Sequence, residues 1–144
     1  MPESYLSLGS NLGNKKVFID RAEKLINREI GEIQKRSSLY ETEPWGFYHP
    51  VNFYNKVVLV KTTLTPEELL SQCLAIERQL GRQREKSKYE ARTVDIDILF
   101  YDKQIITSEA LQIPHPYLHL RRFILEPLNE IAPTLQHPVV NKTI

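Results

Sequence analysis

The pattern of apolar and polar positions changes its period several times along the chain. Residues 4–8, 33–42, 53–63 and 93–101 alternate or are rich in β-branched and aromatic side chains, which predicts strands. In residues 17–26 and 69–80 the apolar positions recur every three to five residues, which predicts helices. The order strand, helix, strand, strand, helix, strand is that of a ferredoxin-like βαββαβ sandwich in the α+β class. Extra C-terminal elements follow, with a segment at 121–133 that we expect to be helical in part.

Capping residues indicate where these elements start and stop. Thr65 as the N-cap, Pro66 in the first turn and Glu68 three residues after Thr65 form a capping box, so the second helix begins here. Gly81 closes that helix, and we expect Gly31 to be the C-cap of the first one. No Gly/Ser linker or internal repeat divides the sequence, so we expect a single domain over residues 1–144.

Composition and charge narrow the class of protein. The chain has 144 residues, of which 41% are hydrophobic and 26% are charged, which is typical of a soluble globular domain. The net charge of +1 excludes a strongly basic nucleic-acid coat, and we expect no nucleic-acid partner. The longest aliphatic run has four residues, so we expect no membrane span. The single cysteine and an N-terminus without a secretory pattern fit a reducing, cytoplasmic location.

Two carboxylates stand out in the last predicted strand. Asp95 and Asp97 are two residues apart, so their side chains point to one face of a strand, while those of Ile96 and Ile98 point to the other. The two carboxylates are then about 6.5–7 Å apart. At this spacing they can bind one or two hard cations and, through the cations, substrate phosphates. A half-exposed strand with a polar face would show the same pattern.

Basic residues on either side of this strand favour the metal hypothesis. Carboxylates for a metal beside guanidinium groups for phosphate oxygens are the components of a phosphoryl-transfer site. The basic residues are Arg82, Arg84, Lys86, Lys88 and Arg92 before the strand, and Arg121 and Arg122 after it. The sequence has neither the spacing of a Walker-type phosphate loop nor that of a Rossmann fingerprint.

Other polar and aromatic residues leave two interpretations open. Glu77 borders the apolar stripe of its helix, where it either contributes to a site or simply pairs with a nearby arginine. His115 and His119 have a spacing found in zinc ligands, but the prolines around them break any helix and no third ligand is evident. The aromatic residues of the Pro-rich loop near Trp45 belong either to the core or to a pocket for a flat heterocycle.

Seven motifs in the same order identify a family that the chain resembles. They are LSLGSNLGNK at 6–15, SSLYETEPWG at 37–46, FYN at 53–55, LTPEELL with Glu77 and GRQR downstream, ARTVDIDIL at 91–99, IPHP at 113–116, and LEPLNEIAP after Arg121. With these motifs the chain resembles the 6-hydroxymethyl-7,8-dihydropterin pyrophosphokinases of folate biosynthesis over nearly its whole length. The resemblance implies a ferredoxin-like fold and the transfer of pyrophosphate from ATP to the hydroxymethyl group of the pterin, with release of AMP.

The resemblance also implies roles for individual residues. Asp95 and Asp97 would hold two Mg²⁺ ions that bridge the ATP phosphates, and Arg82 and Arg92 would act with them in catalysis. The nucleotide-binding residues, some on a loop that closes over ATP, would be Glu77, Arg84, Arg92, Ile98, His115 and Arg121. The residues at or beside the pterin would be Thr42, Pro44, Trp45, Phe53, Asn55 and Phe123. The expected partners are ATP and the pterin, and we expect the protein to be a monomer.

Two other classes of protein remain as alternatives. An RNA-binding module of the RRM type would need a basic sheet face with aromatic residues, whereas two aspartates on the last strand would repel phosphate without a metal. A homologue that has lost activity would lack residues at the metal or phosphate positions, and none is missing. ATP binding that depends on magnesium would distinguish the enzyme from both.

Overall fold

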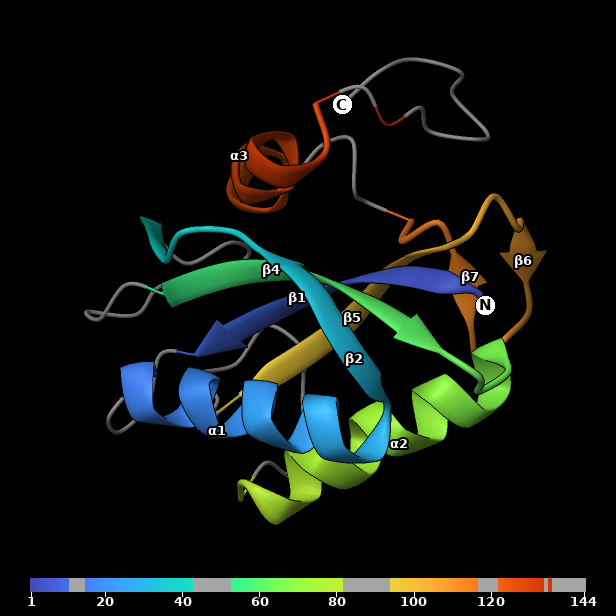
Figure 1. Cartoon of the computed structure of the whole chain (residues 1–144), viewed down its shortest axis with the longest axis horizontal. Helices are drawn as coiled ribbons and strands as arrows, with labels where there is room; N and C mark the ends of the chain where they lie inside the picture. The colour runs from blue at the N-terminus through green and yellow to red at the C-terminus, as the bar shows by residue number, and fades with distance from the viewer. Residues whose placement is uncertain (11–14, 43–52, 82–93, 117–121, 134, 136–144) are drawn as a thin grey trace.

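The computed structural model describes residues 1–10, 15–42, 53–81, 94–116, 122–133 and 135 (Figure 1). Their elements, in chain order, are β1 (Glu3–Ser10), α1 (Lys15–Glu29), β2 (Gly31–Arg36), β3 (Tyr40–Thr42), β4 (Phe53–Thr62), α2 (Pro66–Gln79), β5 (Asp95–Tyr101), β6 (Ile106–Thr107), β7 (Gln112–Ile113) and α3 (Arg122–Ile131). Within this part of the chain, no helix is both long enough and apolar enough to span a bilayer.

The main sheet is antiparallel and has helices on both faces. Its strand order is β2-β4-β1-β5, and the short strand β3 pairs with β4 beside β2. Figure 1 shows α1 and α2 on one face of this sheet and α3 on the opposite face. The short strands β6 and β7 pair with each other in a separate small sheet. The α+β class predicted from the sequence is confirmed.

Apolar side chains are buried on both faces of the main sheet. The larger core lies between the sheet and the α1–α2 layer, and its buried residues include Leu6, Leu8, Ile26, Val58, Ile76 and Ile96. The smaller core lies under α3 and consists of Val57, Leu99, Phe100, Ile124, Leu128 and Ala132. Burial on both faces fixes the register of the strands, because a shift by one residue would move every side chain to the wrong face.

The prediction of one continuous strand over residues 33–42 is wrong, because the structure divides this segment into β2 and β3. The register between β2 and β4 shifts between Ile33 and Lys35, and the ladder is then interrupted at Ser37. The Ser37 hydroxyl accepts a hydrogen bond from the Val57 N–H at 2.9 Å and donates to the Ser38 carbonyl at 2.8 Å. A side-chain hydroxyl thus replaces a backbone partner of β4, and the chain changes direction at this point.

Two glycines flank helices for different reasons. Gly81 has φ +94°, the conformation expected of a glycine that ends a helix, so the predicted end of α2 is confirmed. Gly31 was expected to do the same for α1, but it is the first residue of β2 and is not among the residues with positive φ. A Cβ atom at Gly31 would lie 1.9 Å from the carbonyl oxygen of Lys61. The glycine is therefore required by the close approach of β4.

The capping box predicted at the start of α2 is present in both of its hydrogen bonds. The Glu68 N–H donates to the Thr65 hydroxyl at 3.2 Å, and the Thr65 N–H donates to the Glu68 carboxylate at 2.9 Å. Pro66 occupies the first turn, where a missing N–H costs nothing. The start of α2 is therefore fixed locally, which sets the position of Glu77 further along the same helix.

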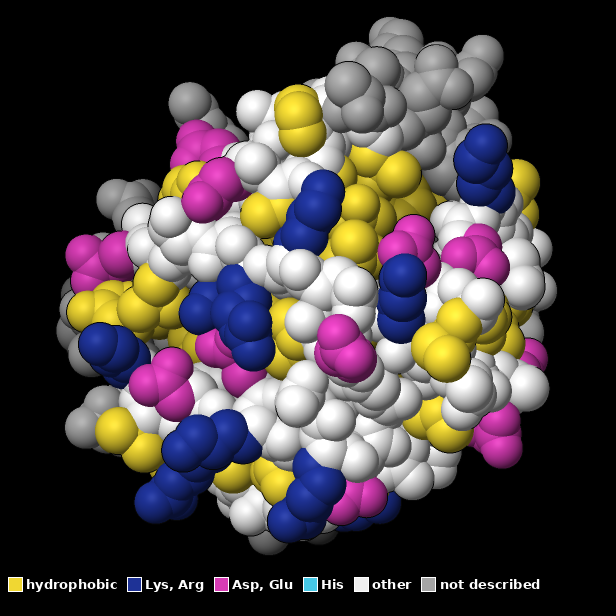
Figure 2. All heavy atoms as spheres, viewed as in Figure 1, with side chains coloured by type: hydrophobic (Ala, Val, Ile, Leu, Met, Phe, Trp, Pro, Cys, Tyr) yellow, Lys and Arg dark blue, Asp and Glu magenta, His cyan; other side chains and the backbone are white. Residues whose placement is uncertain are grey.

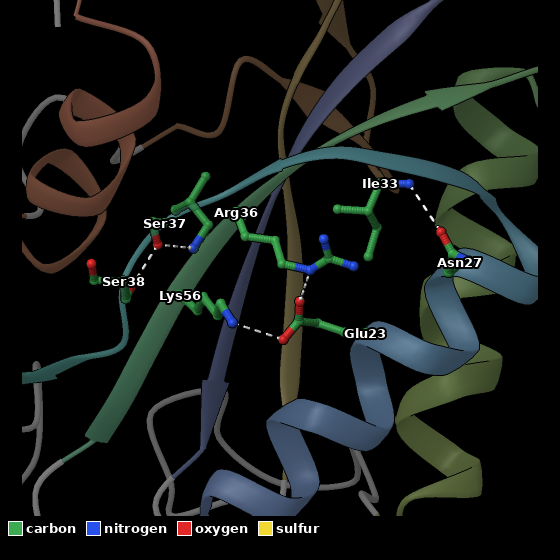
Figure 3. Close-up of polar contacts among 8 residues, drawn as sticks. Glu23, Asn27, Ile33, Arg36, Ser37, Ser38 and Lys56 are labelled. Atoms are coloured by element: carbon green, nitrogen blue, oxygen red, sulfur yellow. Dashed lines mark hydrogen bonds and ion pairs between the residues drawn. The ribbon is translucent and has the colours of Figure 1, made fainter.

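A buried carboxylate joins α1 to the sheet (Figure 3). Glu23, which is 8% exposed, accepts from Arg36 Nε of β2 at 2.7 Å and from Lys56 Nζ of β4 at 2.9 Å. One turn further along α1, the Asn27 side-chain oxygen accepts from the Ile33 N–H at 3.1 Å. These contacts hold α1 against β2 and β4, and so support the part of β4 next to Asn55 from beneath.

The surface in the view of Figure 2 carries charges of both signs. Lysine, arginine, aspartate and glutamate side chains alternate over the part of the chain that is coloured there. The net charge of the whole chain is +1. The visible face therefore has no extended region of a single sign of the kind that steers nucleic acid.

Candidate functional site

Asp95 and Asp97 lie on the sheet face that also carries α3. In the pairing of β1 with β5, Asp97 is opposite Ser7 and Asp95 is opposite Gly9. In the pairing of β1 with β4, Ser7 is opposite Val57, whose side chain packs in the core under α3. Directly paired residues of antiparallel strands point to the same face. Both aspartates therefore project from the α3 face, beside the area that α3 covers.

The backbone beneath the two carboxylates is held firmly. Both aspartates are half-buried, while Ile96 and Ile98 between and beyond them are 3% and 6% exposed in the core on the other face. The predicted alternation of faces is thus confirmed. A strand anchored in this way holds the carboxylates at a fixed spacing of about 6.5–7 Å.

Asn55 lies in the same row of the sheet as Asp95. Gly9 of β1 is opposite Asp95 on one side and opposite Asn55 on the other. The Cα atoms of Asp95 and Asn55 are thus two strand spacings apart, which is about 10 Å. Because Gly9 has no side chain, nothing from β1 separates them on this face. Asn55 is 3% exposed, and its amide can both donate and accept hydrogen bonds.

Three of the residues expected near the pterin lie next to Asn55 or at the start of α3. Thr42 of β3 is opposite Phe53 of β4, two residues before Asn55. Phe123 is the second residue of α3. The backbone therefore brings Thr42, Phe53 and Asn55 to one end of the β3–β4 pair. The other two, Pro44 and Trp45, lie outside the described residues.

Two segments approach the outer edge of β5, which is the last strand of the main sheet. The Glu77 Oε2 atom accepts a hydrogen bond of 2.7 Å from the Ile96 N–H, and the His115 N–H donates to the Leu99 carbonyl at 3.1 Å. The register of β1 with β5 shifts between Tyr5 and Leu6, opposite residues 98–100, so the alternation of backbone groups is irregular here. Ile98 lies between these two contacts.

Glu77 is a buried carboxylate rather than a residue on the helix surface. It is 1% exposed, on α2, which covers the face opposite the two aspartates. A carboxylate at such a position needs hydrogen-bond donors to offset its loss of water. The Ile96 N–H is one of them. Glu77 thus contacts the backbone of the residue between Asp95 and Asp97. An ion pair with an arginine on the helix surface, the other interpretation of Glu77, would not predict this contact.

The basic residues of the predicted site lie outside the part of the chain that the structure describes. They are Arg82, Arg84 and Arg92 on the expected loop and Arg121 before α3. His119, the second histidine of the possible zinc pair, also lies outside it. The roles given to these residues therefore stay predictions.

The described residues fit a magnesium site that the substrate completes. Among them, no cluster of three or more His, Cys, Asp or Glu side chains could hold a metal ion unaided. Mg²⁺, however, usually keeps several waters and binds to proteins through one or two carboxylates together with substrate phosphates. The half-buried pair Asp95 and Asp97 provides that donor set. These residues fit Mg²⁺ better than a metal that demands a complete protein cage.

Ser7 and Gly9 of β1 were not identified from the sequence, although a signal was present. In the LSLG segment, Leu6 and Leu8 point into the core under the α1–α2 layer. The residues between and after them, on the other face, are small. A strand that is apolar on one face and small on the other is typical of a face that a ligand or another backbone approaches closely.

A hydrogen-bonded pair on the β3 side of this row was also missed. Tyr40, which is opposite Asn55, donates its hydroxyl to Glu130 of α3 at 2.8 Å. This hydrogen bond raises the pKa of Tyr40 above its usual 10.0, and burial and the charges of Glu130 and Glu126 act in the same direction. The hydrogen bond from the Ser38 N–H lowers the pKa of Glu130 below its usual 4.5, against a smaller opposing effect of burial. At neutral pH, Tyr40 is therefore the donor and Glu130 the charged acceptor.

Solved structures with the same fold include HPPK-DHPS proteins. The chain superimposes on the HPPK-DHPS protein of Plasmodium falciparum with a TM-score of 0.79, at 21% sequence identity. It covers 42% of that longer chain, while 99% of the present chain is matched. At this identity the likeness establishes the fold.

Comparison with family models and curated proteins establishes the family. Residues 5–133 match the model of the 7,8-dihydro-6-hydroxymethylpterin-pyrophosphokinase (HPPK) family. The 2-amino-4-hydroxy-6-hydroxymethyldihydropteridine pyrophosphokinase of Aquifex aeolicus is 43% identical over 145 residues, covering 100% of this chain and 89% of that protein. The protein of the same name from Porphyromonas gingivalis is 42% identical over 139 residues, covering 93% and 92%. A folic acid synthesis protein of Pneumocystis carinii is 45% identical, but the chain spans only 19% of it. The chain belongs to the HPPK family, as its motifs predicted.

Proposed function

We propose that this chain transfers pyrophosphate from ATP to 6-hydroxymethyl-7,8-dihydropterin, giving AMP and the pterin pyrophosphate in folate biosynthesis. One observation carries the proposal, namely the row on the α3 face of the sheet. A half-buried carboxylate pair lies at one end of this row and the buried amide of Asn55 at the other. Family membership and relatives named for this reaction support the assignment.

Asp95 and Asp97 would hold the magnesium that accompanies ATP, and we propose two ions. When bound, the ions neutralise phosphate charge and orient the group that is transferred. The contribution of the chain is a pair of carboxylates at a fixed spacing on a strand anchored by Ile96 and Ile98. The guanidinium groups of Arg82, Arg84, Arg92 and Arg121 would stabilise the remaining negative charge in the transition state.

The pterin would lie at the other end of the row, against the β3–β4 pair. The Asn55 amide has donors and an acceptor that suit the donor–acceptor edge of the pterin. Phe53 and Phe123 would lie on the two sides of the flat ring, with Thr42, Pro44 and Trp45 around it. About 10 Å separate Asn55 from Asp95 across two strand spacings. A bicyclic ring with a one-carbon arm can bridge such a distance and place its hydroxymethyl group near the phosphates.

The reaction then requires alignment more than acid–base chemistry from the protein. The hydroxymethyl oxygen forms a bond to the β-phosphorus, and the bond from this phosphorus to the α,β-bridging oxygen breaks. The bridging oxygen leaves with AMP, and the hydroxyl proton is released. Attack in line with the leaving oxygen is achieved by holding both substrates on one rigid sheet face. Anchored strands and buried polar groups provide this rigidity.

The adenine would bind at the outer edge of β5. The backbone of Ile98 would pair with the base there, between the contacts made by Glu77 and His115. In this proposal the base would lie beyond the edge of the sheet and the phosphates above its face, near Asp95 and Asp97. The proposed nucleotide-binding roles of Ile98, Glu77 and His115 rest on this geometry.

The finer expectations from the sequence are proposed on the same basis. The strand order β2-β4-β1-β5 supports a ferredoxin-like arrangement with β3, β6, β7 and α3 as additions. We further propose that the protein is a cytoplasmic monomer that binds no nucleic acid, in keeping with its single cysteine and its net charge of +1.

Calorimetric titration with a non-hydrolysable ATP analogue tests the assignment of the metal. We expect tight binding with magnesium and weak binding without it, and Asp95→Asn should reduce the magnesium-dependent part. Asp20→Asn, which changes an exposed helical carboxylate on α1, is the matched control and should bind as the unmodified protein does. Equal affinity with and without magnesium would refute the proposed metal site.

A further inference from the structure

We infer that Glu130 is a positioning residue for the pterin site, because it fixes α3 against the β2–β3 connection and so sets where the first turn of α3 lies over the sheet. The inference rests on the proposed function. It adds a role for a residue that touches neither substrate in that proposal.

Glu130 makes three hydrogen bonds to residues 90 or 92 positions away in the sequence. Its Oε1 atom accepts from the Ser38 N–H at 2.9 Å and from the Tyr40 hydroxyl at 2.8 Å. Its Oε2 atom accepts from the Ser38 hydroxyl at 2.9 Å. Both carboxylate oxygens are thus used, and the donors come from two neighbouring residues of the β2–β3 corner. Charge-assisted hydrogen bonds of this kind are stronger and more directional than those between neutral groups.

The position of Glu130 in its helix is not explained by the helix itself. It lies in the last turn of α3 (Arg122–Ile131), where a negative charge faces the negative end of the helix dipole. The side chain is also exposed, so burial does not account for it. The three hydrogen bonds from Ser38 and Tyr40 do account for it, because they use both oxygens of the side chain as acceptors.

Without these contacts, α3 would be held mainly by apolar packing. Ile124 and Leu128 are completely buried against Val57 and Leu99. Apolar contacts of this type are non-directional. Directional hydrogen bonds at one end of the helix therefore select a single position along the sheet.

Both partners of the contact between Glu130 and Tyr40 belong to elements that border the proposed pterin site. On the strand side, Tyr40 is opposite Asn55, and Thr42 on the same short strand is opposite Phe53. On the helix side, Phe123 lies seven residues before Glu130, about two turns along the same helix, which also contains Pro127. Glu130 thus joins the strand next to Asn55 to the helix that begins with Arg122 and Phe123. A shift of α3 would change the space between these parts.

The test compares Glu130→Ala and Glu130→Gln in the full chain. Each variant is titrated with 6-hydroxymethyl-7,8-dihydropterin in the presence of magnesium and a non-hydrolysable ATP analogue, and separately with the analogue alone. We expect Glu130→Ala to weaken pterin binding roughly two- to thirtyfold, as is typical of residues that transmit coupling, and to leave analogue binding within about twofold. Glu130→Gln should restore most of the affinity, because its amide oxygen can still accept from Ser38 and Tyr40.

Controls separate this inference from the proposed function and from a purely structural role. Asp20→Ala, which removes an exposed helical carboxylate elsewhere, should change neither affinity. Tyr40→Phe removes one of the three hydrogen bonds, so it should weaken pterin binding less than Glu130→Ala does. It replaces Glu130→Ala in the test if that variant does not fold. Unchanged pterin affinity in the folded variants, or equal losses for pterin and analogue, would overturn the inference alone. If the unmodified protein binds no pterin, the proposed function fails and the inference fails with it.

Discussion

The Glu77 carboxylate accepts a hydrogen bond of 2.7 Å from the backbone N–H of Ile96, the residue between Asp95 and Asp97. Glu77 is 1% exposed and comes from α2, whereas the two aspartates project from the opposite face of the sheet. The outer edge of β5 is thereby held from the helix layer at the level of the proposed metal ligands. A buried residue of one layer thus fixes the geometry of a site on the other.

Replacement of Glu77 should affect both stability and the metal site. Glu77→Ala leaves the buried Ile96 N–H without this acceptor, and a buried donor left without a partner costs about 1–3 kcal/mol. We expect a loss of that order in the free energy of unfolding, measured by urea denaturation, together with weaker magnesium-dependent ATP binding. Glu77→Gln keeps an acceptor oxygen and should lose less of both. Identical stability for the alanine and glutamine variants would show that this hydrogen bond is not important.

Asp97→Ala should abolish turnover while leaving the fold intact. The carboxylate is half-buried on the α3 face and is not part of either apolar core. Removal of one of two neighbouring like charges relieves their repulsion, so we expect an unchanged or slightly higher melting temperature in the free protein. Steady-state assays should show a rate at least about a hundredfold lower, because the phosphates lose a metal ligand. A near-normal rate with magnesium would rule out Asp97 as a ligand.

Alanine at the two helix-flanking glycines should reveal two different causes of destabilisation. Gly31→Ala places a Cβ 1.9 Å from the Lys61 carbonyl oxygen, so the backbone of β2 or β4 must shift, at a cost of at least about 1–3 kcal/mol. Gly81→Ala meets no atom of the described residues within 4 Å but adopts φ +94°, which costs about 1–2 kcal/mol. Asparagine, which tolerates a positive φ, should be the better replacement at position 81 and a worse one at position 31. Equal effects of asparagine at both sites would contradict this distinction.

The contact between Glu130 and the β2–β3 corner should depend on pH in a defined direction. The pKa of Glu130 is lowered in the folded protein, chiefly by the Ser38 N–H, so its contribution to stability is present above the usual 4.5 and is lost as the pH falls below that value. The pKa of Tyr40 is raised, so its contribution is complete below 10.0 and is lost only at higher pH. Glu126, on the same helix, adds its charge near Tyr40.

Thermal unfolding between pH 3 and pH 7 checks this dependence. The unmodified protein should lose stability toward acid more steeply than Glu130→Gln, whose amide does not titrate. Because Glu130 is exposed, the difference should be small. Parallel curves for the two proteins would show that ionisation of Glu130 does not contribute.

Local signals in the sequence were sufficient to predict most elements. The capping box at Thr65 and Glu68 and the glycine at position 81 set both ends of α2, because each acts through neighbouring residues. The alternation of Asp95, Ile96, Asp97 and Ile98 placed the carboxylates on one face correctly, since a strand has a period of two. These features depend on a few adjacent residues and therefore appear in the sequence itself.

Features that depend on distant partners could not be predicted in the same way. The break between β2 and β3 requires the Ser37 hydroxyl to meet Val57, and the role of Gly31 requires the approach of Lys61. The contact of Glu130 with Ser38 and Tyr40 likewise joins residues that no local pattern connects. Each depends on which strand or helix becomes a neighbour, which only the folded chain determines.

Product analysis tests the central claim most directly. The protein is mixed with Mg-ATP and 6-hydroxymethyl-7,8-dihydropterin, and the nucleotide products are separated by chromatography. The account predicts AMP in equal amount to the pterin pyrophosphate, and no AMP when the pterin is omitted or when Asp97→Ala replaces the unmodified protein. Formation of ADP with a pterin monophosphate, or AMP that appears without the pterin, would contradict the claim that the chain transfers pyrophosphate to this substrate.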